Sequence, residues 1–117
     1  MNPRSPFLHE RLRAYTHARS FHRLVVRLLG ALPRGHSAIA DQLDRAASSV
    51  LLAIAEGANA RAAGIKRVHF DRAIASGGEC AAALDQIADK QAAPPADLAA
   101  ARRELELTVL LTLGLRR

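Results

Sequence analysis

The five prolines of this 117-residue chain fall into three groups, at residues 3 and 6, at residue 33, and at residues 94 and 95. Proline breaks the interior of a helix because it lacks a backbone N–H and clashes with the preceding turn. The stretches between the groups are long and rich in Ala and Leu, which are strong helix formers. Only four residues are aromatic, whereas strands favour aromatic and β-branched side chains. The proline spacing therefore predicts a chain built from long helices.

Apolar residues recur at the spacing of a buried helix face in four segments, which are residues 8–29, 37–57, 65–90 and 95–113. We expect Ser37 to cap the second helix, Gly57 to end it, and Pro95 to occupy the first turn of the fourth. Short connections force consecutive helices to run antiparallel. The expected fold is therefore all-α: one domain, residues 1–117, forming an antiparallel up-down-up-down four-helix bundle.

Gly77 and Gly78 lie in the middle of the third segment, where each lowers helix propensity by roughly 1 kcal/mol relative to alanine. Either the helix breaks at this point, or the small residues let the backbone of another helix pass unusually close. Because alanine and serine continue the small-residue pattern on both sides, we favour the close approach.

Positive charge is concentrated in the first third of the chain. The net charge is +6, and residues 1–36 contain seven arginines against one glutamate. Arg19, Arg23 and Arg27 stand four residues apart, so on a helix they form a stripe about 12 Å long, and Arg13 lies on the same polar arc. Like charges at this spacing repel each other. The pattern therefore indicates compensation from outside the helix, by phosphate or carboxylate groups.

The sequence carries no recognisable catalytic or metal-binding pattern. Metal-binding bundles use Glu-x-x-His pairs, and no Asp or Glu here is followed by His at the third position. No phosphate-binding loop or nucleophile elbow occurs. The single Cys80 suits a reducing compartment and a small core position. We expect a cytoplasmic protein with no cofactor, no metal, no membrane span and no enzymatic activity.

Two acids stand in apolar surroundings. Glu56 follows an apolar run, and Glu79 lies among glycine and alanine, so both are expected to be semi-buried. Such acids usually pair with arginine or cap a helix end, and we favour that interpretation. A general acid or base would need a cleft and a partner group, and the sequence indicates neither.

Residues 42–57 carry the most specific pattern in the chain. The run Gln42-Leu43-Asp44-Arg45-Ala46-Ala47-Ser48-Ser49-Val50, followed by Ile54-Ala55-Glu56-Gly57, resembles the signature Q-L-R-R-A-A-x-S-I-x-x-N-I-A-E-G of four-helix-bundle proteins encoded within 23S ribosomal RNA intervening sequences. Phe70, Ala73, Ser76 and Glu79 match part of that family's third helix. The chain departs from the family pattern at three positions. It has Asp44 where the family usually has a basic residue, Ala53 where it has Asn, and Ala75 where it has Gly. Asp44 argues against a phosphate contact from that part of the second helix.

The resemblance implies a ring-shaped homopentamer of bundles. It also implies kinship with the accessory variability determinant of diversity-generating retroelements, a basic barrel that binds nucleic acid and a reverse transcriptase. We expect the Ala/Gly face of the third helix, and the surplus apolar positions of the first two, to lie at subunit contacts.

Charge and resemblance together favour a non-enzymatic homo-oligomer that binds RNA or DNA backbone. The candidate contacts are the basic residues Arg13, Arg19, Arg23, Arg27, Arg34, Arg61, Lys66, Arg67 and Arg72. Salt-dependent phosphate contacts dominate such binding. The scarcity of aromatic residues argues against sequence-specific reading of single strands. Two alternatives remain open: a scaffold whose arginines bind an acidic protein partner, and a basic face that only meets solvent.

Overall fold

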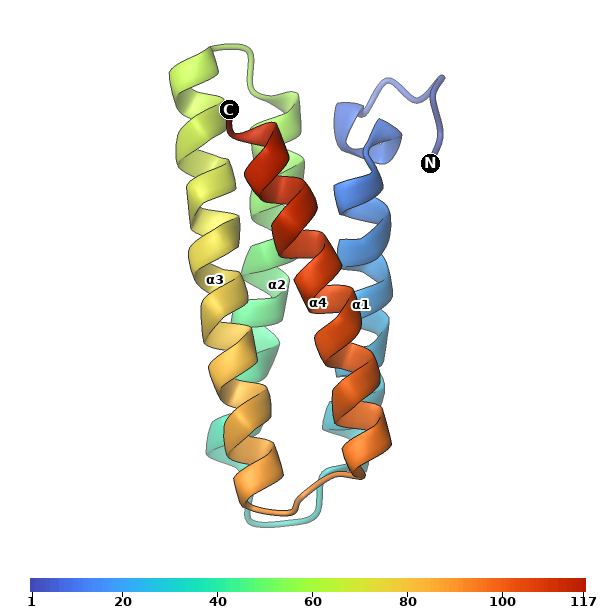
Figure 1. Cartoon of the computed structure of the whole chain (residues 1–117), viewed down its shortest axis with the longest axis vertical. Coiled ribbons are helices and arrows are strands. Elements are labelled where there is room, and N and C mark those ends of the chain that lie inside the picture. Colours follow the sequence, from blue (N-terminus) through green and yellow to red (C-terminus); the bar gives the residue numbers. More distant parts are fainter.

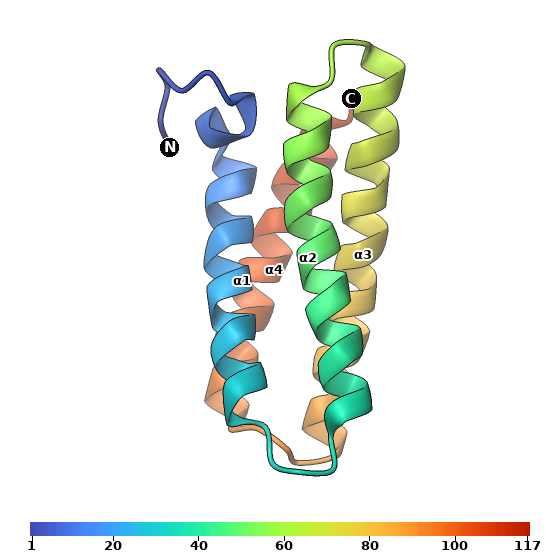
Figure 2. The same cartoon turned by 180° about the vertical axis from the view of Figure 1, so that it is seen from behind.

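The computed structural model describes residues 1–117 and contains one short 3₁₀ helix, four α-helices and no strand. In chain order the elements are η1 (Leu8–Arg11), α1 (Arg13–Ala31), α2 (Ser37–Asn59), α3 (Ala63–Asp89) and α4 (Pro95–Leu115). Figures 1 and 2 show consecutive helices running in alternating directions along a molecule of 43 × 25 × 19 Å. The prediction of an all-helical fold of four helices is confirmed.

Each helix packs against two others, so that α1, α2, α3 and α4 form a closed ring of neighbours around one core. Polar pairs fix the register between α2 and α3: Ser49 meets Ser76, and Glu56 meets Arg72. Residue numbers therefore rise along α2 as they fall along α3. None of the helices has the length and apolar character that crossing a membrane requires.

The core is assembled from apolar side chains that recur every three or four residues on each helix. On α1 the buried face includes Phe21, Val25 and Leu28, and burying a side chain of this size contributes about 1.5–3 kcal/mol. On α4 the buried face includes two hydroxyls, Thr108 and Thr112. Each donates a 2.7 Å hydrogen bond to the carbonyl four residues earlier, so neither needs a partner from another helix.

The start of the first helix differs from the prediction. Leu12 has an extended backbone, with φ −101° and ψ 134°, and separates η1 from α1. The preceding segment is held by its own bonds: the Leu8 N–H donates to Asn59 Oδ1 at 2.9 Å, and the Arg11 Nε donates to the Ser5 carbonyl at 3.0 Å. One bond to the end of α2 and one bond within the N-terminal segment replace the expected first turns of a continuous helix.

The second helix begins at the predicted residue, but its cap and its end need correction. Ser37 is the first residue of α2, but its side chain makes no capping bond, and His36 occupies the N-cap position. Gly57 does not end α2, which continues to Asn59. Gly57 is buried instead inside the helix against the ring of Phe70, where a Cβ atom would lie 2.6 Å from Phe70 Cε1. Glycine is present here to let α3 approach.

The third helix runs unbroken through Gly77 and Gly78, so the alternative of a helix break is wrong. A Cβ atom at Gly77 would lie 2.7 Å from Val109 Cγ2 of α4. At Gly78 it would meet nothing within 4 Å. The close approach therefore occurs at Gly77 alone, and the group that comes close is a side chain of α4 instead of the expected helix backbone.

Candidate nucleic-acid interface

Four exposed arginines of α1 lie on the side of that helix opposite its core face. Arg13, Arg19, Arg23 and Arg27 are all exposed, whereas Phe21 on the same helix is fully buried. The arrangement follows from 100° of rotation per residue, which separates the apolar and basic arcs of one sequence. We call Arg19, Arg23 and Arg27, at intervals of four residues, the arginine stripe.

The arginines of this face have no acidic partner. No carboxylate oxygen lies within 4.0 Å of any of the four guanidinium groups, since every ion pair of the molecule involves other residues. By contrast, Arg72, Arg102 and Arg116 are each paired with an acid on the protein. Like charges four residues apart repel by a few tenths of a kcal/mol per pair. The stripe is therefore a positive charge that the protein leaves uncompensated.

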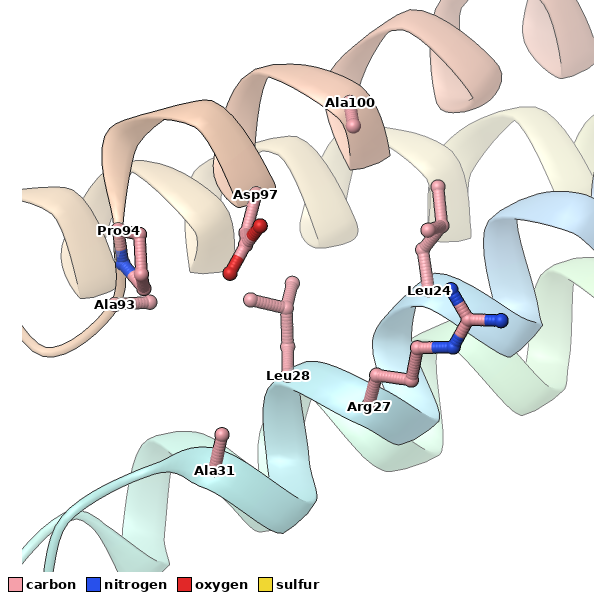
Figure 3. A pocket seen from close by; sticks show the side chains of 8 residues that line it. All are labelled: Leu24, Arg27, Leu28, Ala31, Ala93, Pro94, Asp97 and Ala100. Atoms are coloured by element: carbon pink, nitrogen blue, oxygen red, sulfur yellow. The ribbon is translucent and has the colours of Figure 1, made fainter.

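At one end of the stripe, Arg27 borders a shallow hollow of about 230 Å³ between α1 and the beginning of α4. Leu24, Leu28 and Asp97 also line it (Figure 3). In Figure 3 the Arg27 side chain turns toward Leu24 and away from Asp97, and the two form no ion pair. The acid nearby on α4 therefore leaves the Arg27 charge available.

At the other end, Arg19 and Arg23 border a second hollow, of about 280 Å³, together with Tyr15 and Thr16. Tyr15 precedes Arg19 by four residues and continues the same row. Its half-buried ring packs at its other side against the core and makes an edge-to-face contact with His9, with centroids 4.5 Å apart. Sequence reasoning missed this aromatic neighbour because it weighed the number of aromatic residues rather than their spacing from the arginines.

Of the five remaining predicted bases, two are free and three are engaged within the molecule. Arg34 lies in the loop between α1 and α2, and Arg61 lies between α2 and α3, at the opposite end of the molecule (Figure 1). Both are exposed and unpaired. Lys66 is half-buried, and its Nζ donates to the carbonyls of Gly57 at 3.2 Å and Ala58 at 2.9 Å. Such a lysine satisfies the exposed carbonyls at the end of a helix.

Arg67 and Arg72 are also engaged within the molecule. Arg72 Nη2 donates to Glu56 Oε1 at 2.9 Å, and His69 Nδ1 lies 3.5 Å from the other oxygen of that carboxylate. Arg67 Nε donates to the carbonyl of Arg116 at 3.3 Å. Glu56 therefore pairs with arginine as expected, although it is exposed rather than semi-buried. The nine predicted bases do not form one patch, and the α1 face is where unpaired charges gather.

The signature residues lie along the seam between α2 and α3, and most of them are explained by packing. Leu43, Ala46 and Ile54 are buried in the core. Ser49 Oγ and Ser76 Oγ are 2.8 Å apart in a hydrogen bond that crosses the seam. These residues of the signature are therefore explained by the packing of α2 against α3, and they do not form a binding site.

Besides Glu56, three polar signature residues are exposed. Gln42, Arg45 and Glu79 line a shallow hollow of about 430 Å³ between α2 and α3, and no ion pair joins Arg45 to Glu79. Glu79 was expected to be semi-buried. It faces solvent because the buried positions of α3 around it are taken by Ser76 and Cys80.

Cys80 is fully buried, as predicted. Burial, with a smaller contribution from Glu79, raises the pKa of the Cys80 thiol to about 12, so at neutral pH it is an unreactive thiol. His17 is half-buried, and its Nδ1 lies 2.7 Å from Glu104 Oε2, so this pair links α1 to α4. No three or more His, Cys, Asp or Glu side chains gather in a geometry that could hold a metal ion.

Comparison with known proteins identifies one family. A family model described as 23S rRNA-intervening sequence protein matches residues 10–111. The matched range includes all of α1, α2 and α3 and most of α4, so it covers the bundle rather than a fragment of it. No curated protein matches the chain. The resemblance first indicated by residues 42–57 is confirmed.

Proposed function

Because the chain belongs to the family of 23S rRNA-intervening sequence proteins, we propose that it is a non-enzymatic bundle that binds the phosphate backbone of RNA in the cytoplasm. The observation that carries the proposal is the basic face of α1, where Arg19, Arg23 and Arg27 stand in a row with Arg13 beside them. All four are exposed, and none has a carboxylate within 4.0 Å.

Phosphate is a suitable ligand for such a row. Arginine binds phosphate oxygens through two parallel N–H groups, and the released counterions make the binding strongly dependent on salt. The row spans about 12 Å along the helix, so one backbone could contact several of its members. A ligand with closely spaced negative charges removes the mutual repulsion of the arginines, which no group on the protein does.

We further propose that the bundle assembles into a homo-oligomer, with the pentamer of its family as the expected form. An apolar groove of about 500 Å³ between α3 and α4 supports this, since it includes Ile74, Gly78, Ala81 and Leu110. Leu110 is 65% exposed in the single chain. The groove includes the Ala/Gly face that the sequence indicated. Assembly would multiply the +6 charge of each chain into a strong positive field.

The binding proposal is tested by comparing a variant that lacks the stripe with a control variant. Both variants lose the same number of positive charges, but the control loses them elsewhere on the surface. The variant Arg19→Gln/Arg23→Gln/Arg27→Gln loses three charges. The matched control, Lys90→Gln/Arg103→Gln/Arg117→Gln, loses three charges from exposed residues that make no ion pair. Affinity for an RNA duplex is measured by fluorescence anisotropy over a range of salt concentrations.

We expect the stripe variant to bind much more weakly and to lose roughly 0.9 from the log–log salt slope for each phosphate contact removed. The control should keep most of the affinity and of the slope. Equal weakening of the two variants would mean that only net charge matters, and unchanged binding by the stripe variant would refute the proposal. Binding of an acidic protein but not of RNA would favour the scaffold alternative.

Assembly is tested by light scattering. Leu110→Glu places a charge in the exposed groove, and Ala99→Glu places the same charge at another exposed position of α4. We expect an oligomeric mass for the wild type and for Ala99→Glu, and a smaller mass for Leu110→Glu. A wild-type mass equal to one chain would end the assembly proposal.

A further inference from the structure

Tyr15 and the arginine stripe form one continuous row on α1. Tyr15, Arg19 and Arg23 follow each other at intervals of four residues and line the same hollow of about 280 Å³. Residues four apart on a helix are neighbours on its surface. The hollow therefore combines an aromatic ring with two guanidinium groups that have no partner on the protein.

The ring of Tyr15 is held in place by its surroundings. It packs against the core and meets His9 edge to face, with an interplanar angle of 73°. His9 is in turn fixed by Asn59, whose Nδ2 lies 2.8 Å from His9 Nδ1. A ring that is already positioned loses little conformational freedom when a ligand stacks on it. Tyr15 is therefore prepared to serve as a platform.

Charged groups of both signs border the hollow. Arg19, Arg23 and the N-terminal residue Met1 line it together with one acid, Glu10 of η1. The Glu10 carboxylate accepts a hydrogen bond from the Ser5 hydroxyl, and its backbone carbonyl accepts one from the Asn2 N–H at 2.7 Å. A phosphate is attracted to Arg19 and Arg23 and repelled by Glu10. A ligand with an uncharged ring on Tyr15 and a phosphate at the two arginines matches these charges.

We propose that the hollow binds an unpaired nucleotide, with the base stacked on Tyr15 and adjacent phosphates held by Arg19 and Arg23. The inference rests on the proposed function and adds to it a preference for single-stranded RNA. In a duplex the base faces are covered by their neighbours and the grooves expose only edges, so a stacking platform is useful only for an unpaired base.

Tyrosine fluorescence tests the stacking directly, because the chain contains one tyrosine and no tryptophan, and its emission therefore reports on Tyr15 alone. The probes are oligoadenylate RNA, the same strand annealed to its complement, and inorganic polyphosphate, which has no bases. We expect saturating oligoadenylate to quench the emission, and the duplex and polyphosphate to bind without comparable quenching. Unchanged emission at saturation with oligoadenylate, or equal quenching by all three probes, would overturn the inference.

Two variants at the same position provide an independent measurement. Tyr15→Leu removes the aromatic face and keeps an apolar side chain against the core, and Tyr15→Phe keeps the face. Since a stacked base contributes about 1–3 kcal/mol, Tyr15→Leu should weaken oligoadenylate binding roughly 5- to 150-fold and change duplex binding little. Tyr15→Phe should bind like the wild type. Circular dichroism melting shows whether each variant is folded.

The outcomes separate this inference from the function on which it rests. If Tyr15→Leu, once shown to be folded, binds oligoadenylate as tightly as Tyr15→Phe while Arg19→Gln/Arg23→Gln/Arg27→Gln still loses binding, the stripe holds phosphate but no base stacks on Tyr15. If the arginine variant also binds as the wild type does, the proposed function fails as well.

Discussion

Adding one methyl group at Gly57 should destabilise the bundle, whereas adding it at Gly78 should stabilise it. Both glycines lie inside helices, so replacing either with alanine gains about 1 kcal/mol of helix propensity. At Gly57 the new Cβ atom would lie 2.6 and 2.8 Å from two ring carbons of Phe70 and 3.2 Å from His69 Cβ. At Gly78 nothing lies within 4 Å.

The difference in stability between the two variants measures the steric cost at Gly57, because both variants gain the same helix propensity. Phe70 is buried, so its ring cannot move aside without disturbing its neighbours, and overpacking of this kind costs about 1–3 kcal/mol. Unfolding entropy of about 2.1 cal/mol/K per residue makes 1 kcal/mol equivalent to about 4 °C for 117 residues. The Tm of Gly57→Ala should therefore lie about 4–12 °C below that of Gly78→Ala.

The assay is thermal unfolding followed by circular dichroism, with all proteins at one concentration. Light scattering on each variant is needed because Gly78 borders the apolar groove, and assembly would itself raise Tm. If both variants have the same mass in solution as the wild type and Gly57→Ala melts at or above Gly78→Ala, then Phe70 does not press on Gly57. The explanation for the presence of glycine at this position would then be wrong.

Three further predictions concern buried and paired groups. Ser76→Ala should lose about 1–3 kcal/mol of stability in urea unfolding because it leaves the Ser49 hydroxyl without its partner, and Ser49→Ala/Ser76→Ala should recover part of that loss. Cys80 should react with a thiol reagent only as fast as the protein unfolds, because its pKa is raised to about 12 and it is fully buried; a native-state rate like that of a free thiol would contradict this. The Arg116 guanidinium, hydrogen-bonded to Asp71, lowers the pKa of that carboxyl below its ordinary value of 3.8, so the pair should stabilise the fold above about pH 4 and lose this contribution as the pH falls further. Asp71→Asn should flatten that part of the pH dependence of Tm, and an identical profile would show that the pair is not formed.

The candidate interface could be located from the sequence only in part. The intervals of four residues between Arg19, Arg23 and Arg27 place them on one helix face, and the structure places them there without partners. The same reasoning put Lys66 and Arg72 with them. The sequence does not reveal that Lys66 satisfies the last carbonyls of α2 or that Arg72 pairs with Glu56, because those partners lie on another helix.

What the sequence determined alone was local: the helical period, the prolines that separate the helices, and the signature of residues 42–57 that identifies the family. These depend on neighbours within a few residues, which share a helix face whatever the rest of the chain does. What only the tertiary structure decided was every feature that depends on distance between helices. Gly57 is buried inside α2, where it makes room for the Phe70 ring of α3. The arginine stripe stays unpaired because no helix brings a carboxylate within 4.0 Å of it.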